Sequence, residues 1–300
     1  MMVAVTGATG FIGRRLCMRL QDCGHGVRAL VRRADHGLAG TEVVRGSLAD
    51  DEALAQLVLG ADAVVHLAGS VRGADREAFD AVNVAGTRRL LAVLHATAPD
   101  ARLVHVSTLA ARRPELSDYA ASKHGAEVLV RTAPLPGRTI LRPTAVYGPG
   151  DRELQPILET MARGLATVPG DRRNQVTLLH VDDLADAILA ALATGGDHDE
   201  PYELCDDHPA GYDWPTLAAA VGAHSGRPVR LVTVPRSLLA AVAGTNRALA
   251  RLTGRAPMLT PGKVRELTHA DWSCDPAPFA RACGWSPAID LPAGLATVLP

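Results

Sequence analysis

Near the start of the sequence lies the stretch Met2-Val3-Ala4-Val5-Thr6-Gly7-Ala8-Thr9-Gly10-Phe11-Ile12-Gly13. Its apolar first half predicts a buried strand, and the residues from Phe11 onward predict a helix after a glycine-rich turn. Glycines at positions 7, 10 and 13 allow a tight turn, let the backbone approach a pyrophosphate, and let the helix pack closely on the sheet. The stretch therefore predicts a dinucleotide site, the alternative being a turn that connects strand and helix without a ligand.

Length and composition fit a globular enzyme that acts on a small molecule. The chain has 300 residues and is 47% hydrophobic, which is ample material for a core. Its 31 basic and 32 acidic residues nearly cancel, so charge gives no reason to expect general binding to nucleic acid or to an acidic membrane surface. We therefore expect neither nucleic acid nor a membrane as partner, and a small molecule recognised by a local site.

The cysteines and the N-terminal residues predict a cytoplasmic protein without a metal site. The five cysteines form no CxxC pair and show no histidine-linked metal spacing, which favours reduced thiols. The first residues contain no basic region followed by an apolar signal core, and no stretch reaches about 18 apolar residues. The cysteines are Cys17, Cys23, Cys205, Cys274 and Cys283.

Short apolar strands alternate with helical patterns through the first half of the chain. Strands are predicted over 3–6, 27–31, 42–45, 63–68, 102–107 and 138–142, and helices near 10–20, 51–58, 76–96 and 119–132. Such alternation is typical of α/β proteins in which helices cover both faces of a parallel sheet. The predicted fold is a doubly wound parallel sheet.

The pattern changes after the turn-rich segment 147–151. Helices are predicted near 152–163, 183–193, 215–225, 236–252 and 276–283, separated by loops rich in Gly, Pro and Asp. We therefore predict a dinucleotide-binding domain over 1–150. Residues 151–300 are expected to form mainly a smaller, mostly helical substrate domain, with 176–197 packing back on the first domain.

A second group of residues indicates carbonyl chemistry. Tyr119 and Lys123 are four residues apart, so on a helix they project from the same face. A phenol beside a fixed ammonium ionises more easily than its reference pKa of about 10, and so can transfer a proton near neutrality. Ser107 and Thr108 follow a predicted strand at the sheet edge where ligands bind, and a hydroxyl there can orient a carbonyl. The alternatives are a solvent-facing helical pair and hydroxyls that only cap the strand.

These motifs resemble the extended short-chain dehydrogenases/reductases, the NAD(P)-dependent epimerase/dehydratase-like family with a Rossmann fold. The resemblance spans nearly the whole chain. Besides the glycine turn and Tyr119-Ala120-Ala121-Ser122-Lys123, it rests on five further runs in the family's order. They are Val65-His66-Leu67-Ala68-Gly69, Asn83-Val84-Ala85-Gly86-Thr87, Leu141-Arg142-Pro143-Thr144-Ala145-Val146-Tyr147-Gly148-Pro149-Gly150, His180-Val181-Asp182-Asp183-Leu184-Ala185 and Gly284-Trp285-Ser286-Pro287.

The resemblance implies a role for each matching residue. Tyr119 would be the general acid/base, Lys123 would hold the nicotinamide ribose and lower the tyrosine pKa, and Thr108 would hydrogen-bond the reacting oxygen. Ser107 is the less favoured alternative to Thr108, and Asn83 would support the site either catalytically or structurally. The implied cofactor contacts are Gly7, Thr9, Gly10, Phe11, Ile12, Gly13, Leu67, Ala68, Gly69, Lys123, Pro143 and Val146.

The end of the second strand bears on which dinucleotide is bound. NAD-selective sites place a carboxylate there, to accept hydrogen bonds from the adenosine ribose. Here Val31 is followed by Arg32 and Arg33, and guanidinium groups can bind a 2'-phosphate. We therefore predict NADP, with NAD as the alternative if both arginines are only solvated surface residues.

Three departures from the sugar-nucleotide members of the family favour a simple reductase. Leu109-Ala110 stands where dehydratases carry an Asp-Glu pair, and Val176-Thr177 stands where many nucleotide-sugar enzymes carry Arg-Asp, although Arg172 and Arg173 lie close by. The interval from Thr108 to Tyr119 is only 11 positions, which predicts a more open pocket.

We therefore expect an NADPH-dependent reductase, or the corresponding dehydrogenase, for a ketone or aldehyde on a moderately apolar small molecule. The alternatives are a nucleotide-sugar epimerase with tightly bound NAD and a non-catalytic dinucleotide-binding subunit. By resemblance, a homodimer is expected.

Overall fold

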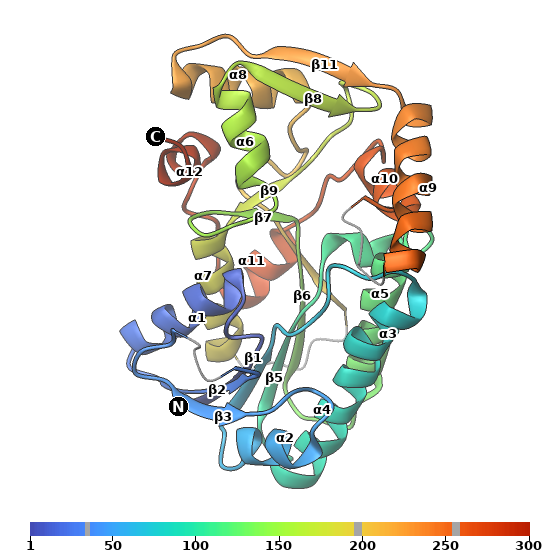
Figure 1. The fold of residues 1–300 in the computed structure, drawn as a ribbon. Coiled ribbons are helices and arrows are strands. Elements are labelled where there is room, and N and C mark those ends of the chain that lie inside the picture. Colours follow the sequence, from blue (N-terminus) through green and yellow to red (C-terminus); the bar gives the residue numbers. More distant parts are fainter. Residues whose placement is uncertain (34–36, 195–199, 254–258) are drawn as a thin grey trace.

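A seven-stranded parallel sheet forms the centre of the protein (Figure 1). The computed structural model describes residues 1–33, 37–194, 200–253 and 259–300. In space the strands follow the order β10-β6-β5-β4-β1-β2-β3. They are β1 (Met2–Thr6), β2 (Gly26–Val31), β3 (Glu42–Arg45), β4 (Ala63–His66), β5 (Arg102–Val106), β6 (Arg138–Pro143) and β10 (Tyr202–Leu204). The direction of winding reverses between β1 and β4, and doubly wound sheets bind ligands at the carboxyl ends of the strands at this point.

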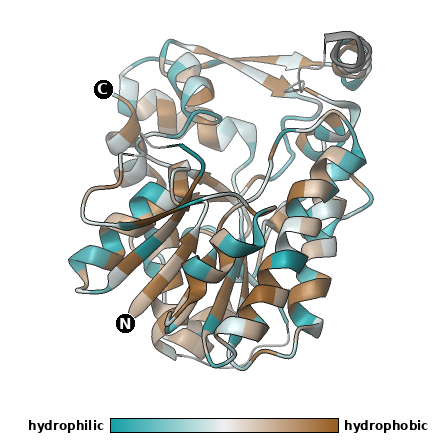
Figure 2. Cartoon of the chain, turned by 60° about the horizontal axis from the view of Figure 1, so that its bottom comes forward, coloured by the Kyte–Doolittle hydropathy of each residue, from teal (hydrophilic) through white to brown (hydrophobic). Residues whose placement is uncertain are grey.

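Helices cover both faces of the sheet, as the strand alternation predicts (Figures 1 and 2). The helices α1 (Phe11–Asp22), α7 (Val181–Thr194) and α11 (Ala277–Cys283) share one buried apolar cluster with the sheet. The helices α2 (Asp51–Val58), α4 (Ala85–Thr97) and α5 (Asp118–Thr132) share the cluster on the other face. Val3 and Val5 of β1 point into the first cluster and Ala4 into the second, as the two-residue period of a strand requires.

The helix predicted over 76–96 is in fact two helices, α3 (Arg76–Asn83) and α4, which meet at Val84. The Thr87 hydroxyl donates a hydrogen bond to the Asn83 carbonyl oxygen at 2.6 Å, and threonine bonds of this kind bend helices. The strands predicted over 63–68 and 102–107 end earlier, at His66 and Val106. The residues after both strands are therefore loop at the carboxyl edge.

The C-terminal part also contains short strands that the sequence did not predict. The further helices of this part are α6 (Gln155–Ala162), α8 (Trp214–Ser225), α9 (Arg236–Thr253), α10 (Pro261–Leu267) and α12 (Leu291–Val298). In the first half of the chain, a short 3-10 helix, η1 (Leu109–Arg112), follows β5. Two parallel pairs join them: β8 (Leu165–Pro169) with β11 (Arg230–Val234), and β7 (Ala145–Tyr147) with β9 (Leu178–His180). Three to five residues are too few for a clear alternation, so these strands gave no periodic signal.

Two segments from the second half of the chain pack on the sheet. Helix α7 lies along α1, where Asp182 binds Arg15 and Asp186 binds Arg19 in ion pairs. Strand β10 pairs with β6 as the seventh strand of the sheet. In the part of the chain that the structure describes, no helix combines the length and the apolar character needed to cross a bilayer.

Candidate active site

The glycine turn after β1 is packed too tightly for side chains at two of its positions. A Cβ on Gly7, whose φ is +75°, would lie 2.7 Å from the backbone nitrogen of Ala68. A Cβ on Gly13 would lie 2.2 Å from the Gly7 carbonyl oxygen. Gly7 therefore permits contact between the turn and the loop after β4, and Gly13 permits α1 to begin directly against the turn.

The N-terminus of α1 is open to an anionic ligand. Gly10 is exposed and caps the helix without a side-chain hydrogen bond, and the first turn holds no acidic residue. By contrast, Asp50, Asp75 and Ser117 cap α2, α3 and α5 through their side chains. Unpaired N–H groups at the positive end of a helix bind phosphate, so this turn fits a dinucleotide pyrophosphate. Thr9 beside it is exposed, and Phe11 and Ile12 are half-buried.

A chain of buried hydrogen bonds fixes the loop after β4 beside this turn. The Ala68 N–H donates to Thr6 Oγ1 at 3.2 Å, and Thr6 Oγ1 lies 2.7 Å from His66 Nδ1. His66 Nε2 lies 3.0 Å from Thr87 Oγ1, whose proton is already donated to Asn83. The Nε2 atom of His66 therefore carries the ring proton, and Nδ1 accepts from Thr6. Burial lowers the pKa of His66 to about 3, so the ring stays neutral.

Asn83 connects this loop to the helix that carries Tyr119. Its Oδ1 accepts a hydrogen bond from the Ser70 N–H at 2.7 Å. Its Nδ2 donates to the Ser70 carbonyl oxygen at 3.1 Å and to Ser122 Oγ at 2.9 Å. A Cβ on Gly69 would lie 3.1 Å from Asn83 Oδ1 and 3.9 Å from Lys123 Nζ. Protein groups therefore occupy both ends of the Asn83 amide.

Thr108, Tyr119 and Lys123 lie together at the carboxyl end of β5. Ser117 Oγ caps α5 by accepting from the Ala120 N–H at 2.9 Å, which places Tyr119 in the first turn and Lys123 in the second. The hydroxyls of Tyr119 and Thr108 are hydrogen-bond partners. Lys123 is buried, and its ammonium donates to the Val106 carbonyl oxygen at 2.9 Å. The residues that the sequence singled out for proton transfer thus form one group.

The pKa of Tyr119 is raised in this structure, which is opposite to the expected effect of Lys123. Burial is the main cause, and the charge of Glu266 adds to it, while the hydrogen bond with Thr108 acts weakly in the other direction. Burial also lowers the pKa of Lys123 to about 8, against the charge of Glu127. Tyr119 is therefore protonated at neutral pH, and in this structure its surroundings oppose loss of the proton.

Four further predicted residues lie on or after the strands β4 to β7. Ser107 is buried, and its hydroxyl has no hydrogen-bond partner within the described residues. Pro143 is the buried last residue of β6, and Val146 of β7 packs against the apolar cluster shared by the sheet and α1. Leu67 is half-buried and packs on the same cluster.

Arg32 and Arg33 follow β2 directly, and both are exposed. No carboxylate stands at the end of this strand, where Val31 is the last residue. Neither arginine has a side-chain hydrogen bond or ion pair with any residue from the described ranges. Both guanidinium groups are thus available to a ligand that reaches the carboxyl end of β2.

Glu266 is a site residue that the sequence did not indicate. It lies on α10, is buried, and accepts a hydrogen bond from the Ser117 hydroxyl, 149 positions earlier in the chain. Lys263 Nζ donates to its other oxygen at 3.1 Å. A Cβ on Gly262 would lie 2.8 Å from Ser117 Cβ, so α10 rests directly on the N-terminus of α5.

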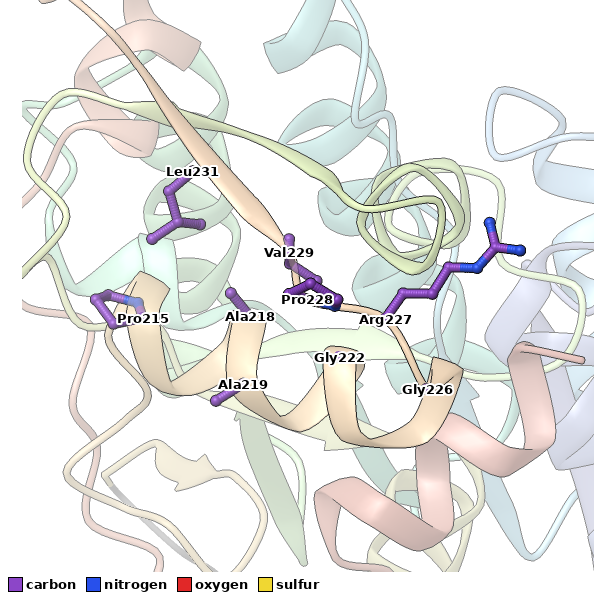
Figure 3. A pocket seen from close by; sticks show the side chains of 9 residues that line it. All are labelled: Pro215, Ala218, Ala219, Gly222, Gly226, Arg227, Pro228, Val229 and Leu231. Atoms are coloured by element: carbon purple, nitrogen blue, oxygen red, sulfur yellow. The ribbon is translucent and has the colours of Figure 1, made fainter.

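An open groove of about 490 Å³ lies between α8 and β11, away from these residues (Figure 3). No residue of the glycine turn or of the Thr108, Tyr119 and Lys123 group lines it. We therefore assign it no part in the chemistry. Its lining consists of Pro215, Ala218, Ala219, Gly222, Gly226, Arg227, Pro228, Val229 and Leu231.

The doubly wound sheet, the open helix N-terminus after β1 and the hydroxyl pair at the end of β5 together define a dinucleotide-dependent oxidoreductase. The family model for the NAD dependent epimerase/dehydratase family matches residues 3–205. The chain belongs to this family, and it is an NAD(P)-dependent reductase of the extended short-chain type.

Similar proteins include two named reductases. The chain is 37% identical over 287 residues to a ceramide reductase of Caulobacter vibrioides, covering 93% of this chain and 88% of the relative. It is 32% identical over 331 residues to a 2-alkyl-3-oxoalkanoate reductase of Stenotrophomonas maltophilia, covering 98% and 97%. Among solved structures, MoeE5 in complex with UDP-glucuronic acid and NAD has the same fold, with a TM-score of 0.75 and 22% identity over 99% and 96% of the two chains.

Proposed function

We propose that this protein reduces a ketone or aldehyde on an apolar small molecule with NADPH. The observation that carries the proposal is the hydroxyl pair of Tyr119 and Thr108 at the carboxyl end of β5, with buried Lys123 one turn away. The relatives named for reduction of ceramide and of 2-alkyl-3-oxoalkanoates support a carbonyl substrate that carries apolar chains.

In the proposed mechanism the protein orients the carbonyl and supplies a proton. The bound nicotinamide supplies the hydride to the carbonyl carbon. Tyr119, which is protonated at neutral pH, donates its hydroxyl proton to the carbonyl oxygen. Thr108 holds the Tyr119 hydroxyl by a hydrogen bond and fixes its direction. Lys123, one turn along α5 from Tyr119, would supply positive charge to the tyrosinate after the proton has left.

The preference for NADPH is assigned to Arg32 and Arg33. Both side chains are exposed just after β2, and β2 lies beside β1, whose following turn fits the pyrophosphate. A guanidinium binds phosphate bidentately, whereas it gives a ribose hydroxyl no comparable partner. We expect Arg32→Ala/Arg33→Ala to weaken NADPH binding about tenfold or more while NADH binding changes little. Equal effects on both nucleotides would contradict the assignment.

The contacts of two surface arginines favour a reductase over a nucleotide-sugar epimerase. Arg172 donates to Thr233 Oγ1 at 3.0 Å and to the Leu231 carbonyl oxygen at 2.9 Å, and Arg173 forms an ion pair with Asp171. Arg172 and Arg173 are the two residues that could replace the missing diphosphate-binding arginine. Their side chains instead bind residues near β8 and β11, which favours the reductase.

Two measurements on the purified protein test this proposal together. Fluorescence titration compares NADPH with NADH, and mass spectrometry identifies any nucleotide released on denaturation. Exchangeable NADPH with a clear preference over NADH supports the reductase. Retained NAD that does not exchange would favour the epimerase, and binding of neither nucleotide would favour the non-catalytic subunit.

The same proposal divides the chain into a dinucleotide-binding unit and a substrate-binding unit. Residues 1–150 with 176–197 would form the dinucleotide-binding unit, because α7 packs along α1. Strand β10 and helix α11 would join this unit, and the rest of 151–300 would bind the substrate. The homodimer and the cytoplasmic location stay predictions.

A further inference from the structure

A long segment of the C-terminal part carries positive charge without any carboxylate. Between positions 214 and 265 the sequence has eight basic residues and no Asp or Glu, although the whole chain has a net charge of −1. The basic residues are Arg227, Arg230, Arg236, Arg247, Arg251, Arg255, Lys263 and Arg265. The sequence between positions 214 and 265 is therefore strongly cationic, although the net charge of the chain is close to zero.

Three arginine side chains at the start of this segment are available to bind a partner. Arg227, Arg230 and Arg236 are exposed, and none of them forms an ion pair with a residue in the described ranges. Arg230 shares a face of β11 with Val232, which is itself 39% exposed. Charge and apolar surface thus occur side by side on this strand.

Helix α9 presents apolar side chains on two faces. Ala243 is completely buried and Leu239 is half-buried, so this face packs against the protein. Leu238 and Val242, one turn apart on another face, are 56% and 45% exposed. We define the α9 surface by the exposed residues Arg230, Val232, Arg236, Leu238 and Val242. Basic residues combined with exposed aliphatic side chains on a helix are typical of elements that lie in a membrane interface.

We propose that the α9 surface docks on a membrane of anionic phospholipids. Anionic headgroups complement Arg230 and Arg236, which are exposed and form no ion pair with a described residue, and the acyl region accommodates Leu238 and Val242. A second copy of the chain fits less well, because a symmetric contact would bring two cationic segments together. The proposal revises the expectation that charge excludes an acidic membrane surface, since that expectation used only the total charge.

Helix α10 connects α9 to the helix that carries Tyr119. Helix α9 packs on α10, at the edge of the molecule in Figure 1. Helix α10 carries Glu266, which binds Ser117 at the N-terminus of the helix that holds Tyr119. A membrane bound at α9 would therefore be one helix, α10, away from the catalytic helix. If the proposed function is right, this would bring a substrate with apolar chains close to Tyr119, but docking itself does not depend on that reaction.

Vesicle sedimentation with the full-length protein tests the proposal. The probes are phosphatidylcholine vesicles with and without phosphatidylglycerol, and no substrate or nucleotide is added. We expect the protein to sediment with the anionic vesicles only. Arg230→Ala and Arg236→Ala should each weaken binding about fivefold, and Leu238→Ser/Val242→Ser about tenfold. The matched control is Leu59→Ser, which removes a 63% exposed leucine before β4 and should leave binding unchanged.

Three outcomes would overturn the proposal. The first is no sedimentation with anionic vesicles, and the second is equal binding by wild type and Leu238→Ser/Val242→Ser. The third is a dimer, seen by analytical ultracentrifugation, that this double variant dissociates, because the surface would then be covered by a second copy. Circular dichroism and reduction activity of each variant show that the exposed substitutions leave the fold intact, so loss of binding reports on the surface itself.

Discussion

Replacing Asn83 by alanine should loosen the connection between the loop after β4 and the catalytic helix. The change removes three hydrogen bonds, two of them to the backbone of Ser70 and one to Ser122 Oγ. The Ser122 hydroxyl keeps a second hydrogen bond, to the Tyr119 carbonyl oxygen at 2.8 Å. The loss of stability therefore comes mainly from the Ser70 N–H and carbonyl oxygen, which lose their side-chain partner. Ser70 is half-buried, so each of its two lost hydrogen bonds costs about 0.5–1.5 kcal/mol, which predicts a loss of about 1–3 kcal/mol for the two Ser70 groups.

Urea unfolding of wild type, Asn83→Ala and Ser70→Ala measures this effect. Ser70→Ala is the matched control, because it removes only the hydroxyl that donates to the Arg72 carbonyl oxygen and keeps the backbone groups that Asn83 binds. We expect the control to lose less than about 1 kcal/mol. Dinucleotide binding should weaken severalfold in Asn83→Ala alone, since Gly69 lies against Asn83. Equal stability losses in the two variants would refute the positioning role.

Three further predictions follow from packing and charge. In Gly13→Ala the new Cβ would meet the Gly7 carbonyl oxygen at 2.2 Å, so the turn must move and dinucleotide binding should weaken more than about tenfold in a fluorescence titration. Glu127→Ala should destabilise by about 3–5 kcal/mol in urea, because it leaves the Arg142 guanidinium buried without its partner, whereas Glu200→Ala at an exposed pair should cost less than about 0.5 kcal/mol. Burial holds the pKa of Lys123 near 8 in the folded protein against 10.5 in the unfolded chain, so the unfolded state binds more protons between these values. Stability should therefore rise with pH between about pH 8 and about pH 10 in wild type, by at most about 1.4 kcal/mol per pH unit, and Lys123→Met should remove that rise. An identical pH dependence in both proteins would contradict the lowered pKa.

The parts of the fold and site that the sequence predicted are those that local patterns determine. The glycine turn lies within one strand–helix connection, and Tyr119 and Lys123 lie one turn apart on one helix. Both are set by residues a few positions apart, so their geometry follows from the regular dimensions of strand and helix. The alternation of apolar strands and helices likewise predicted the parallel sheet.

The parts that the sequence missed depend on contacts between distant segments. Glu266 reaches Ser117 from 149 positions away, and nothing in either local pattern indicates that α10 packs on α5. The raised pKa of Tyr119 has the same origin, because burial and the charge of Glu266 outweigh any effect that the spacing to Lys123 suggests. Strands β8 and β11 pair across more than sixty positions and are five residues each, too short to be distinguished from loop.

NADPH oxidation by wild type and Tyr119→Phe, measured with a panel of apolar ketones and 3-oxo esters, tests the central claim most directly. The phenylalanine keeps the ring beside Phe79 and removes only the hydroxyl that would donate the proton. We expect wild type to reduce at least one ketone of the panel, and the variant to be slower by about 10²–10⁴-fold with NADPH affinity unchanged. Ketone reduction at the wild-type rate by Tyr119→Phe would contradict the account.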